Sequence, residues 1–163
     1  MTEQRYFASD HQYEAELDRL RLMEKIQNPA TIRHLEALGV SQGWDCLEVG
    51  AGAGSVAQWL CTRVGPRGKV VATDIDTRFL SHLSAPNLEI RRHDIIEDDL
   101  ETDQFDLAHC RGVLMHLPKP EKALRQMANA LRPGGWLLIE EGDFGSILSS
   151  DITNPAAADF TAM

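Results

Sequence analysis

The sequence lacks the features that mark a nucleic-acid-binding or membrane-spanning protein. Lysine and arginine number 16 against 25 acidic residues, which gives a formal net charge of −9. The longest basic cluster is the pair Arg91 and Arg92. A nucleic-acid partner requires cations that neutralise phosphates, so we do not expect one. The strongest apolar runs, such as "WLLI" at 136–139, are far shorter than a bilayer-spanning helix, so no membrane partner is expected either.

Signals for secretion, disulfides and metal binding are also missing. The opening "MTEQRYFASDHQ" does not have the basic-then-apolar order of a secretory signal. The three cysteines, Cys46, Cys61 and Cys110, are odd in number and show no C-x-x-C spacing. We therefore expect a cytoplasmic protein with reduced thiols and no metal centre.

The first part of the chain, residues 1–42, is predicted to be a helical segment that packs on the rest. Its stretch 13–27 places Leu17, Leu20 and Met23 at helical spacing between charged residues. Asn28 is expected to cap a second helix with Pro29 in its first turn and Gly39 as its end.

Residues 43–163 are predicted to form a single α/β core, because short apolar strands alternate with helices. Strands are expected at 45–50, 68–76, 87–94, 105–112 and 134–141. A helix is expected at 55–65, with Val56, Leu60 and Val64 on one face, and a short one at 77–84. This alternation is typical of a doubly wound parallel sheet that is covered by helices on both faces.

The last predicted helix, within 120–135, shows an apolar stripe at helical spacing. Leu124, Met127, Ala128 and Leu131 follow the i, i+3, i+4, i+7 pattern, and Pro133-Gly134 is expected to end the helix.

The stretch "LEVGAGAGS" at 47–55 carries glycines at positions 50, 52 and 54 between a strand and a helix. Glycines let a ligand approach the backbone closely, and a helix N-terminus offers free N–H groups and a positive dipole. The alternative is a tight strand-to-helix turn without a ligand. The dinucleotide fingerprint G-x-G-x-x-G would place its third glycine at Ser55, so the loop departs from it.

An acid, Asp74, ends the second predicted strand, 74 − 50 = 24 residues after the first glycine. This is close to the roughly 20-residue spacing of an acid that accepts hydrogen bonds from ribose hydroxyls. A carboxylate can accept from both hydroxyls of a ribose. The alternative role is that of a helix N-cap, which Asp76 or Thr77 could fill instead.

These motifs, in this order, resemble the class I S-adenosylmethionine-dependent methyltransferases over about residues 45–141. "LEVGAGAG" resembles the first motif of that family and "VVATDID" the second. "HDI" at 93–95, "FDLAHCRGVLMHL" and "LRPGGWLLIEE" are similar to the segments that follow. The resemblance implies a Rossmann-like fold, S-adenosyl-L-methionine as cofactor, S-adenosyl-L-homocysteine as product, and methyl transfer to an acceptor.

The resemblance also implies roles for individual residues. The backbone of Gly50, Ala51 and Gly52, with Gly54 after them, would lie against the methionyl and ribose parts of the cofactor. Glu48 would brace the loop or reach the cofactor's amino group through water, and Asp74 would bind the ribose. Asp94 would accept from the adenine amino group, with Ile75 and Ile95 on either side of the ring and His93 as a structural neighbour. Cys110 and Arg111 would border the methionyl end, although Arg111 could instead pair with a surface acid.

The chemistry requires no dedicated nucleophile, because the cofactor brings the reactivity and the protein aligns the acceptor and excludes water. His109 and His116 are candidates for a base, with packing or capping as the alternative. The N-P-P-Y type of motif for methylation of nucleobase amino groups is absent after the fourth strand. A small-molecule acceptor is therefore expected.

Only 163 − 141 = 22 residues follow Glu141, fewer than the helix and antiparallel strands with which the family usually continues. The resemblance therefore predicts a C-terminally shortened core whose last strand has an open edge. An open edge favours pairing with a second chain, so a homodimer is expected.

Two other functions remain open on the sequence. A nicotinamide-dependent oxidoreductase could use the same scaffold, but neither Tyr6 nor Tyr13 is followed by the lysine of a Tyr-x-x-x-Lys pair. A cofactor-binding module without turnover is the other alternative, and the sequence alone does not separate it from an enzyme.

Overall fold

The computed structural model describes residues 10–142, with side chains from residue 12 onward, and is built around one parallel sheet. The five strands are β1 (Asp45–Val49), β2 (Lys69–Asp74), β3 (Leu88–Arg92), β4 (Phe105–Arg111) and β5 (Leu131–Glu140). Their order is β3-β2-β1-β4-β5, and every neighbouring pair is parallel. The predicted doubly wound α/β class is therefore confirmed.

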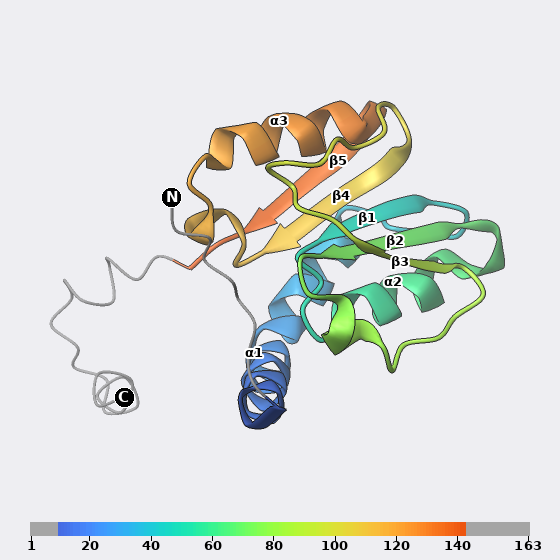
Figure 1. Ribbon diagram of the computed structural model, residues 1–163. Helices are drawn as coiled ribbons and strands as arrows, with labels where there is room; N and C mark the ends of the chain where they lie inside the picture. Colours follow the sequence, from blue (N-terminus) through green and yellow to red (C-terminus); the bar gives the residue numbers. More distant parts are fainter. Residues whose placement is uncertain (1–9, 143–163) are drawn as a thin grey trace, which may run out of the picture.

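Helices lie on both faces of this sheet (Figure 1). α1 (Asp10–Ala37) and α2 (Ser55–Val64) are on one side, and α3 (Pro120–Ala130) is on the other. Short 3-10 turns follow α2 at Gly65–Arg67, β2 at Thr77–Leu80 and β4 at Leu114–His116. Within residues 10–142, no helix is both long enough and apolar enough to cross a bilayer.

Successive side chains of β1 and β4 point to opposite faces of the sheet, and the core is therefore divided into two clusters. Cys46 and Leu107 are fully buried in the cluster beneath α2, whereas Leu47 and Ala108 are fully buried in the cluster beneath α3. A strand that is covered on both faces reads as an almost continuous apolar run, and this is why the sequence alone located these strands.

The expected face of α2 is confirmed, because Val56, Leu60 and Val64 are all buried. The expected stripe of α3 is partly wrong. Ala123, Met127 and Ala130 are its fully buried residues, while Ala128 is exposed and Leu124 only half-buried.

Leu131 does not continue the helix, because it already pairs with Phe105 at the start of β5. Pro133 and Gly134 therefore lie within the range of β5, near a register shift between Phe105 and Leu107.

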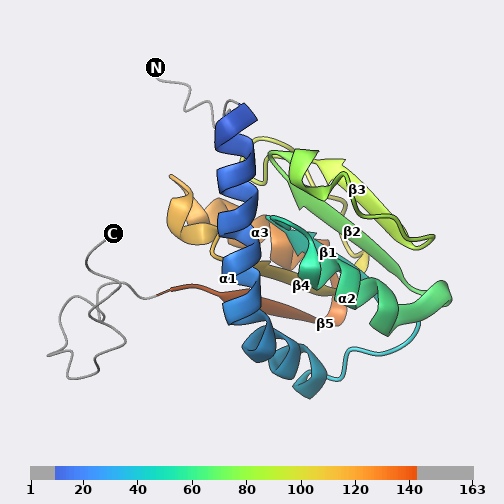
Figure 2. The same cartoon turned by 90° about the horizontal axis from the view of Figure 1, so that it is seen from below.

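The expected break at Asn28 is also wrong, since α1 is one helix of 28 residues with Pro29 inside it. The side chain of Asn28 does not cap a helix. It contacts Ser55 at the start of α2 and Arg111 at the end of β4. These tertiary contacts hold the backbone helical, although proline removes one helical hydrogen bond. Figure 2 shows α1 lying beside α2 and across the ends of β4 and β5.

The expected helix at 77–84 is a single 3-10 turn. Asp76 caps it, because its carboxylate accepts from the amide of Arg78 at 3.2 Å. Asp74 is therefore not needed as the N-cap of this turn.

Candidate functional site

A cavity of about 1040 Å³ lies between α1 and the carboxyl ends of β1, β4 and β5. Gly50–Ala53 form its floor, and Arg111 and Glu140 line it from β4 and β5. Ligands of open parallel sheets bind outside the carboxyl ends of the strands, where the strand order reverses, and β1 and β4 meet at that point. This cavity is therefore the candidate site.

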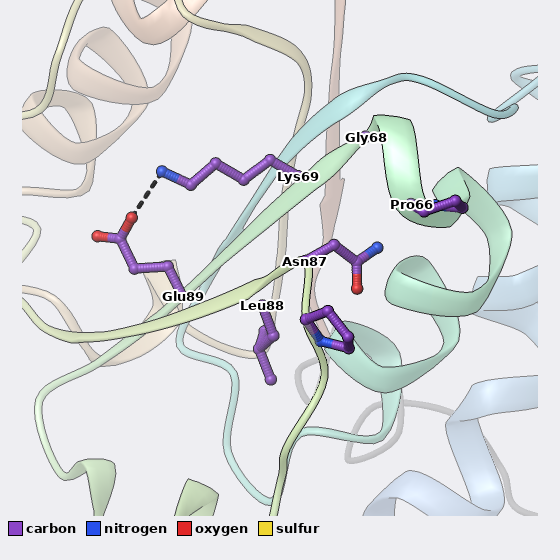
Figure 3. A pocket seen from close by; sticks show the side chains of 7 residues that line it. Pro66, Gly68, Lys69, Asn87, Leu88 and Glu89 are labelled. Carbon is purple, nitrogen blue, oxygen red and sulfur yellow. Dashed lines mark ion pairs between the residues drawn. The ribbon is translucent and has the colours of Figure 1, made fainter.

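A second, smaller hollow of about 270 Å³ lies at the opposite end of β2 and β3 (Figure 3). Lys69 and Glu89 form an ion pair of 2.6 Å across it, and both side chains are only about half-buried. The amide of Asn87 donates to the carbonyls of Cys61 and Gly65 and so connects β3 to the end of α2. The Lys69–Glu89 pair and the Asn87 amide are thus engaged with other groups of the protein, and we assign no site to this hollow.

The three glycines of the loop adopt the left-handed conformation that favours glycine. Their φ angles are 68° at Gly50, 58° at Gly52 and 85° at Gly54. A Cβ atom on Gly50 would lie 2.3 Å from Val113, and one on Gly54 would lie 2.3 Å from Leu83. The loop thus needs glycine both for its backbone and for its close packing.

The amide donors of this loop are largely satisfied within the protein. The amide of Ala51 donates to Thr73 O at 3.0 Å, and that of Gly54 donates to Ala51 O at 2.8 Å. The first amide of α2, on Ser55, donates at 3.1 Å to the carboxylate of Glu24 from α1. The sequence predicts free N–H groups at this helix N-terminus, and the structure shows that the first of them is taken by a carboxylate of α1.

Asp74 faces the glycine loop. Its Oδ2 accepts from the amide of Gly52 at 2.9 Å, and its Oδ1 accepts from the amide of Asp76 at 2.9 Å. Burial raises the pKa of Asp74, while these two amides act in the opposite direction. Because each carboxylate oxygen has two lone pairs, accepting capacity remains for a ligand.

The residues expected around an adenine lie in different surroundings, outside the cavity. Ile75 is exposed at 52%, whereas Ile95 is buried in the cluster beneath α3. Asp94 is half-buried, and its Oδ1 accepts from the amide of Ile96 at 2.9 Å in the turn after β3. His93 is buried, and its Nδ1 has no hydrogen-bond partner among the described residues.

A row of charged side chains crosses three strands beneath α1. His109 is fully buried on β4, with its Nδ1 2.7 Å from Glu48 Oε2 on β1 and its Nε2 3.0 Å from Glu140 Oε2 on β5. Burial by itself lowers the pKa of His109, but the two carboxylates outweigh it and raise that pKa to about 9. Burial by itself raises the pKa of Glu140, but hydrogen bonds with His109, Thr31 and His34 outweigh it and lower that pKa to about 2. His109 is therefore an imidazolium between two carboxylates.

The structure separates the two residues expected at the methionyl end. Cys110 is fully buried in the cluster beneath α3, where burial raises the pKa of its thiol to about 12. Arg111 points to the other face of β4 and lines the cavity. Its guanidinium donates to Thr31 Oγ1 at 2.7 Å and to Asn28 Oδ1 at 3.1 Å, and both partners are uncharged residues of α1.

The sequence did not reveal the part that α1 contributes to the site. Glu24, Asn28, Thr31 and His34 lie three or four residues apart, which is the spacing of one helix face. This polar spacing was the available signal, but a polar face of a helix is ordinarily solvated. His109 is a candidate base on the sequence. It is fully enclosed, and both of its ring nitrogens face carboxylates.

Comparison with known proteins agrees with this geometry. The methyltransferase domain family matches residues 47–137, more than half of the chain. Methyltransferase str2 of Strobilurus tenacellus is 32% identical over 111 residues, with 68% of this chain and 40% of that protein covered. The ubiquinone/menaquinone biosynthesis C-methyltransferase UbiE of Hahella chejuensis is 30% identical over 115 residues, with 66% and 46% covered.

A solved SAM-dependent methyltransferase from Aquifex aeolicus has the same fold. It superposes with a TM-score of 0.63 at 22% identity, with 76% of this chain and 71% of that chain covered. The chain spans less than half the length of the two curated relatives. The matched family, the parallel sheet and the glycine loop agree, and the chain belongs to the class I S-adenosylmethionine-dependent methyltransferases.

Proposed function

We propose that the cleft at the glycine loop binds S-adenosylmethionine and that the chain transfers its methyl group to a small-molecule acceptor. The observation that carries this proposal is that two backbone amides of the loop region already donate to carboxylates of the protein. A dinucleotide would place its pyrophosphate at the N-terminus of the helix after the first strand. Here Glu24 occupies the amide of Ser55, and Asp74 occupies that of Gly52. The site therefore favours a ligand without a phosphate at this position.

Asp74 is proposed to bind the ribose. Its carboxylate is fixed against the loop by Gly52 and Asp76 and retains lone pairs for two hydroxyl donors. The uncovered side chain of Ile75 is proposed to pack on the adenine, and Asp94 to accept from its amino group. Ile95 is buried in the cluster beneath α3 and is not part of this proposed contact.

The methionyl part is proposed to lie over Gly50–Gly52, between Glu48 and Arg111. Glu48 lines the cavity, and one of its carboxylate oxygens is engaged by His109. The cavity-lining Arg111 has hydrogen bonds to neutral side chains, so its charge is available to the ligand's carboxylate. The two side chains suit the two charged ends of an amino acid.

The acceptor is proposed to enter the part of the cavity between α1 and the turn after β4. Ile26 and Met115 line this part and are exposed at 59% and 44%. Glu141 holds the turn, because its Oε1 accepts from the amides of Val113 and Leu114 at 3.0 and 2.9 Å. An acceptor with an apolar portion would cover these two side chains.

When bound, the cofactor supplies an activated methyl group, so the protein has to align the acceptor and exclude water. The enclosing residues of α1 and the turn after β4 serve this purpose. The ion pairs of His109 hold the carboxyl ends of β1, β4 and β5 in fixed register beneath them.

Titration calorimetry with S-adenosylmethionine, S-adenosylhomocysteine and NAD in parallel tests the proposal. We expect binding of both adenosyl compounds and no heat with NAD. Binding of NAD, or silence with S-adenosylhomocysteine, would contradict it.

We also propose that a second copy of the chain pairs with the edge of the sheet. Within residues 10–142, β5 is an outer strand that pairs only with β4, and its Trp136 is 49% exposed. Exposed strand edges favour association. Light scattering over a wide concentration range should give the mass of a dimer, and a constant monomer mass would remove this proposal.

A further inference from the structure

We propose that His34 is the base that takes the proton from a hydroxyl or amino acceptor, and that Glu140 positions it. This inference rests on the proposed function, because it assigns the acceptor side of the same cavity. It also names the acceptor class as a protic nucleophile, an O–H or N–H group.

The hydrogen bond between His34 and Glu140 fixes the tautomer of the imidazole. Nδ1 of His34 is 2.8 Å from Glu140 Oε1. Glu140 is ionised at neutral pH, since its pKa is lowered to about 2, and an ionised carboxylate only accepts hydrogen bonds. Nδ1 must then carry the proton, and Nε2 of the neutral ring has the free lone pair.

The position of Glu140 is itself determined from the opposite side. Its Oε2 is 3.0 Å from Nε2 of the fully buried His109, which is paired with Glu48. The carboxylate thus has one oxygen on each imidazole. Other charged or titratable groups that line the cavity around His34 are Arg19, Glu24, Glu48, Arg111, His116 and Glu141.

His34 is accessible to a ligand, whereas His109 is not. Its side chain retains 54% of its accessible surface and lines the same cavity as Gly50–Ala53. His116 also lines this cavity, but within residues 10–142 no carboxylate contacts its ring. An exposed imidazole oriented by a carboxylate is the arrangement that general-base catalysis uses.

The lone pair of the acceptor's oxygen or nitrogen forms the new bond to the methyl carbon. The carbon–sulfur bond breaks, and its electrons stay on sulfur, which becomes a neutral thioether. The acceptor's proton passes to Nε2 of His34, and the resulting imidazolium is stabilised by Glu140 until the proton is lost to water.

An NMR experiment tests the geometry without any acceptor. Two-bond proton–nitrogen spectra of ¹⁵N-histidine-labelled protein, saturated with S-adenosylhomocysteine, report the tautomer of each ring, and His34→Gln assigns the His34 signal. We expect His34 as the Nδ1–H tautomer in the wild type and a mixture of tautomers in Glu140→Gln. A wild-type His34 protonated on Nε2 alone would overturn the proposal.

A kinetic experiment tests the role with two acceptors of different ionisation, catechol and 4-nitrothiophenolate. The second is already ionised and has no proton to give. We expect His34→Gln to lower kcat for catechol by about 100-fold or more, with KM nearly unchanged, and to leave the thiolate reaction within about threefold. If neither probe is turned over, the NMR experiment decides.

His82→Gln, on the exposed surface, is the matched control and should not alter either rate. Equal loss on both acceptors, or loss of catechol turnover in His116→Gln but not in His34→Gln, would overturn the proposal. Calorimetry with S-adenosylhomocysteine separates a failure of the proposed base from a failure of the proposed function. Unchanged binding with unchanged catechol turnover in His34→Gln refutes the base alone, whereas no binding to the wild type refutes the proposed function.

Discussion

His109 and Glu48 form a buried ion pair of 2.7 Å in the middle of the sheet, at register positions that face each other across β1 and β4. The pair is completed by Glu140 on the far side of the ring. A buried charge of this kind is stable only when its partners are present, so the three strand ends are electrostatically coupled.

This coupling predicts a fall in stability at alkaline pH. The pKa of His109 is about 9 in the folded protein and about 6.5 in an unfolded chain. Between these values the folded state holds the extra proton, so the free energy of unfolding falls as pH rises. The contribution is complete below pH about 6.5 and is lost as pH passes through 9.

Urea unfolding of the wild type and His109→Gln between pH 6 and 10 measures this effect. The buried thiols have raised pKa values, so they also make the free energy of unfolding fall at high pH. They are present in both proteins, and the difference between the two pH curves therefore isolates His109. Parallel curves for the two proteins would show that His109 is not charged in the folded state.

Replacement of Asp74 is predicted to weaken cofactor binding. Asp74→Asn replaces the carboxylate that would accept from the ribose hydroxyls by a neutral amide. The shape of the side chain beside Gly52 is nearly unchanged. We expect the Kd for S-adenosylhomocysteine to rise at least tenfold, about 1.4 kcal/mol, with little change in melting temperature. Asp18→Asn makes the same charge change on the exposed side of α1 and should bind like the wild type. An unchanged Kd in Asp74→Asn would mean that the sugar is not bound there.

Because the pKa of Asp74 is raised, affinity should also decline with acid at a higher pH than an ordinary aspartate would give. The carboxylate is the binding form, so protonation removes acceptor capacity as pH falls. Calorimetry from pH 7 down to pH 4 measures this decline, and Asp74→Asn should lack it.

Gly54 and Gly39 provide a matched pair for the packing of the loop. Their φ angles are 85° and 82°, so alanine is strained to a similar extent at both positions. At Gly54 the new Cβ would lie 2.3 Å from Leu83 and 2.8 Å from Leu80, whereas at Gly39 nothing lies within 4 Å. We expect Gly39→Ala to cost about 1–2 kcal/mol of unfolding free energy and Gly54→Ala at least about 1 kcal/mol more. Equal losses in urea unfolding would contradict the close packing.

The sequence predicted the features of this protein that follow from local patterns. Strands such as β1 and β4 are buried on both faces, so their apolar runs are visible without a structure. Glycine spacing predicted the loop, and an acid at the end of the next strand made Asp74 a candidate ligand residue. The structure adds that its carboxylate accepts from the amide of Gly52.

Features that depend on distant contacts could not be predicted in this way. Asn28 and Pro29 have the local pattern of a helix start, but contacts with Ser55 and Arg111 keep α1 continuous. Glu24 accepts from the first amide of α2, which the local pattern left free. Glu140 and His34 are 106 residues apart, and only the docking of α1 brings them together.

Asn28 is predicted to be one of the polar links that hold α1 to the core. Its Nδ2 donates a hydrogen bond to Ser55 Oγ at 2.9 Å, and its Oδ1 accepts one from the guanidinium of Arg111 at 3.1 Å. Asn28→Ala should cost about 1–3 kcal/mol and accelerate amide exchange throughout α1, because part-buried partners lose their hydrogen bonds. Lys25→Ala, an exposed change on the same helix, should leave exchange unaltered. Unchanged exchange in Asn28→Ala would show that α1 is held to the core without the hydrogen bonds of Asn28.

A crystal structure of the protein with S-adenosylhomocysteine tests the central claim most directly. We predict that the ligand's amino-acid part lies over Gly50–Gly52 and that both ribose hydroxyls are within hydrogen-bond distance of the Asp74 carboxylate. A ligand bound elsewhere, or an Asp74 side chain turned away from the ribose, would contradict the account.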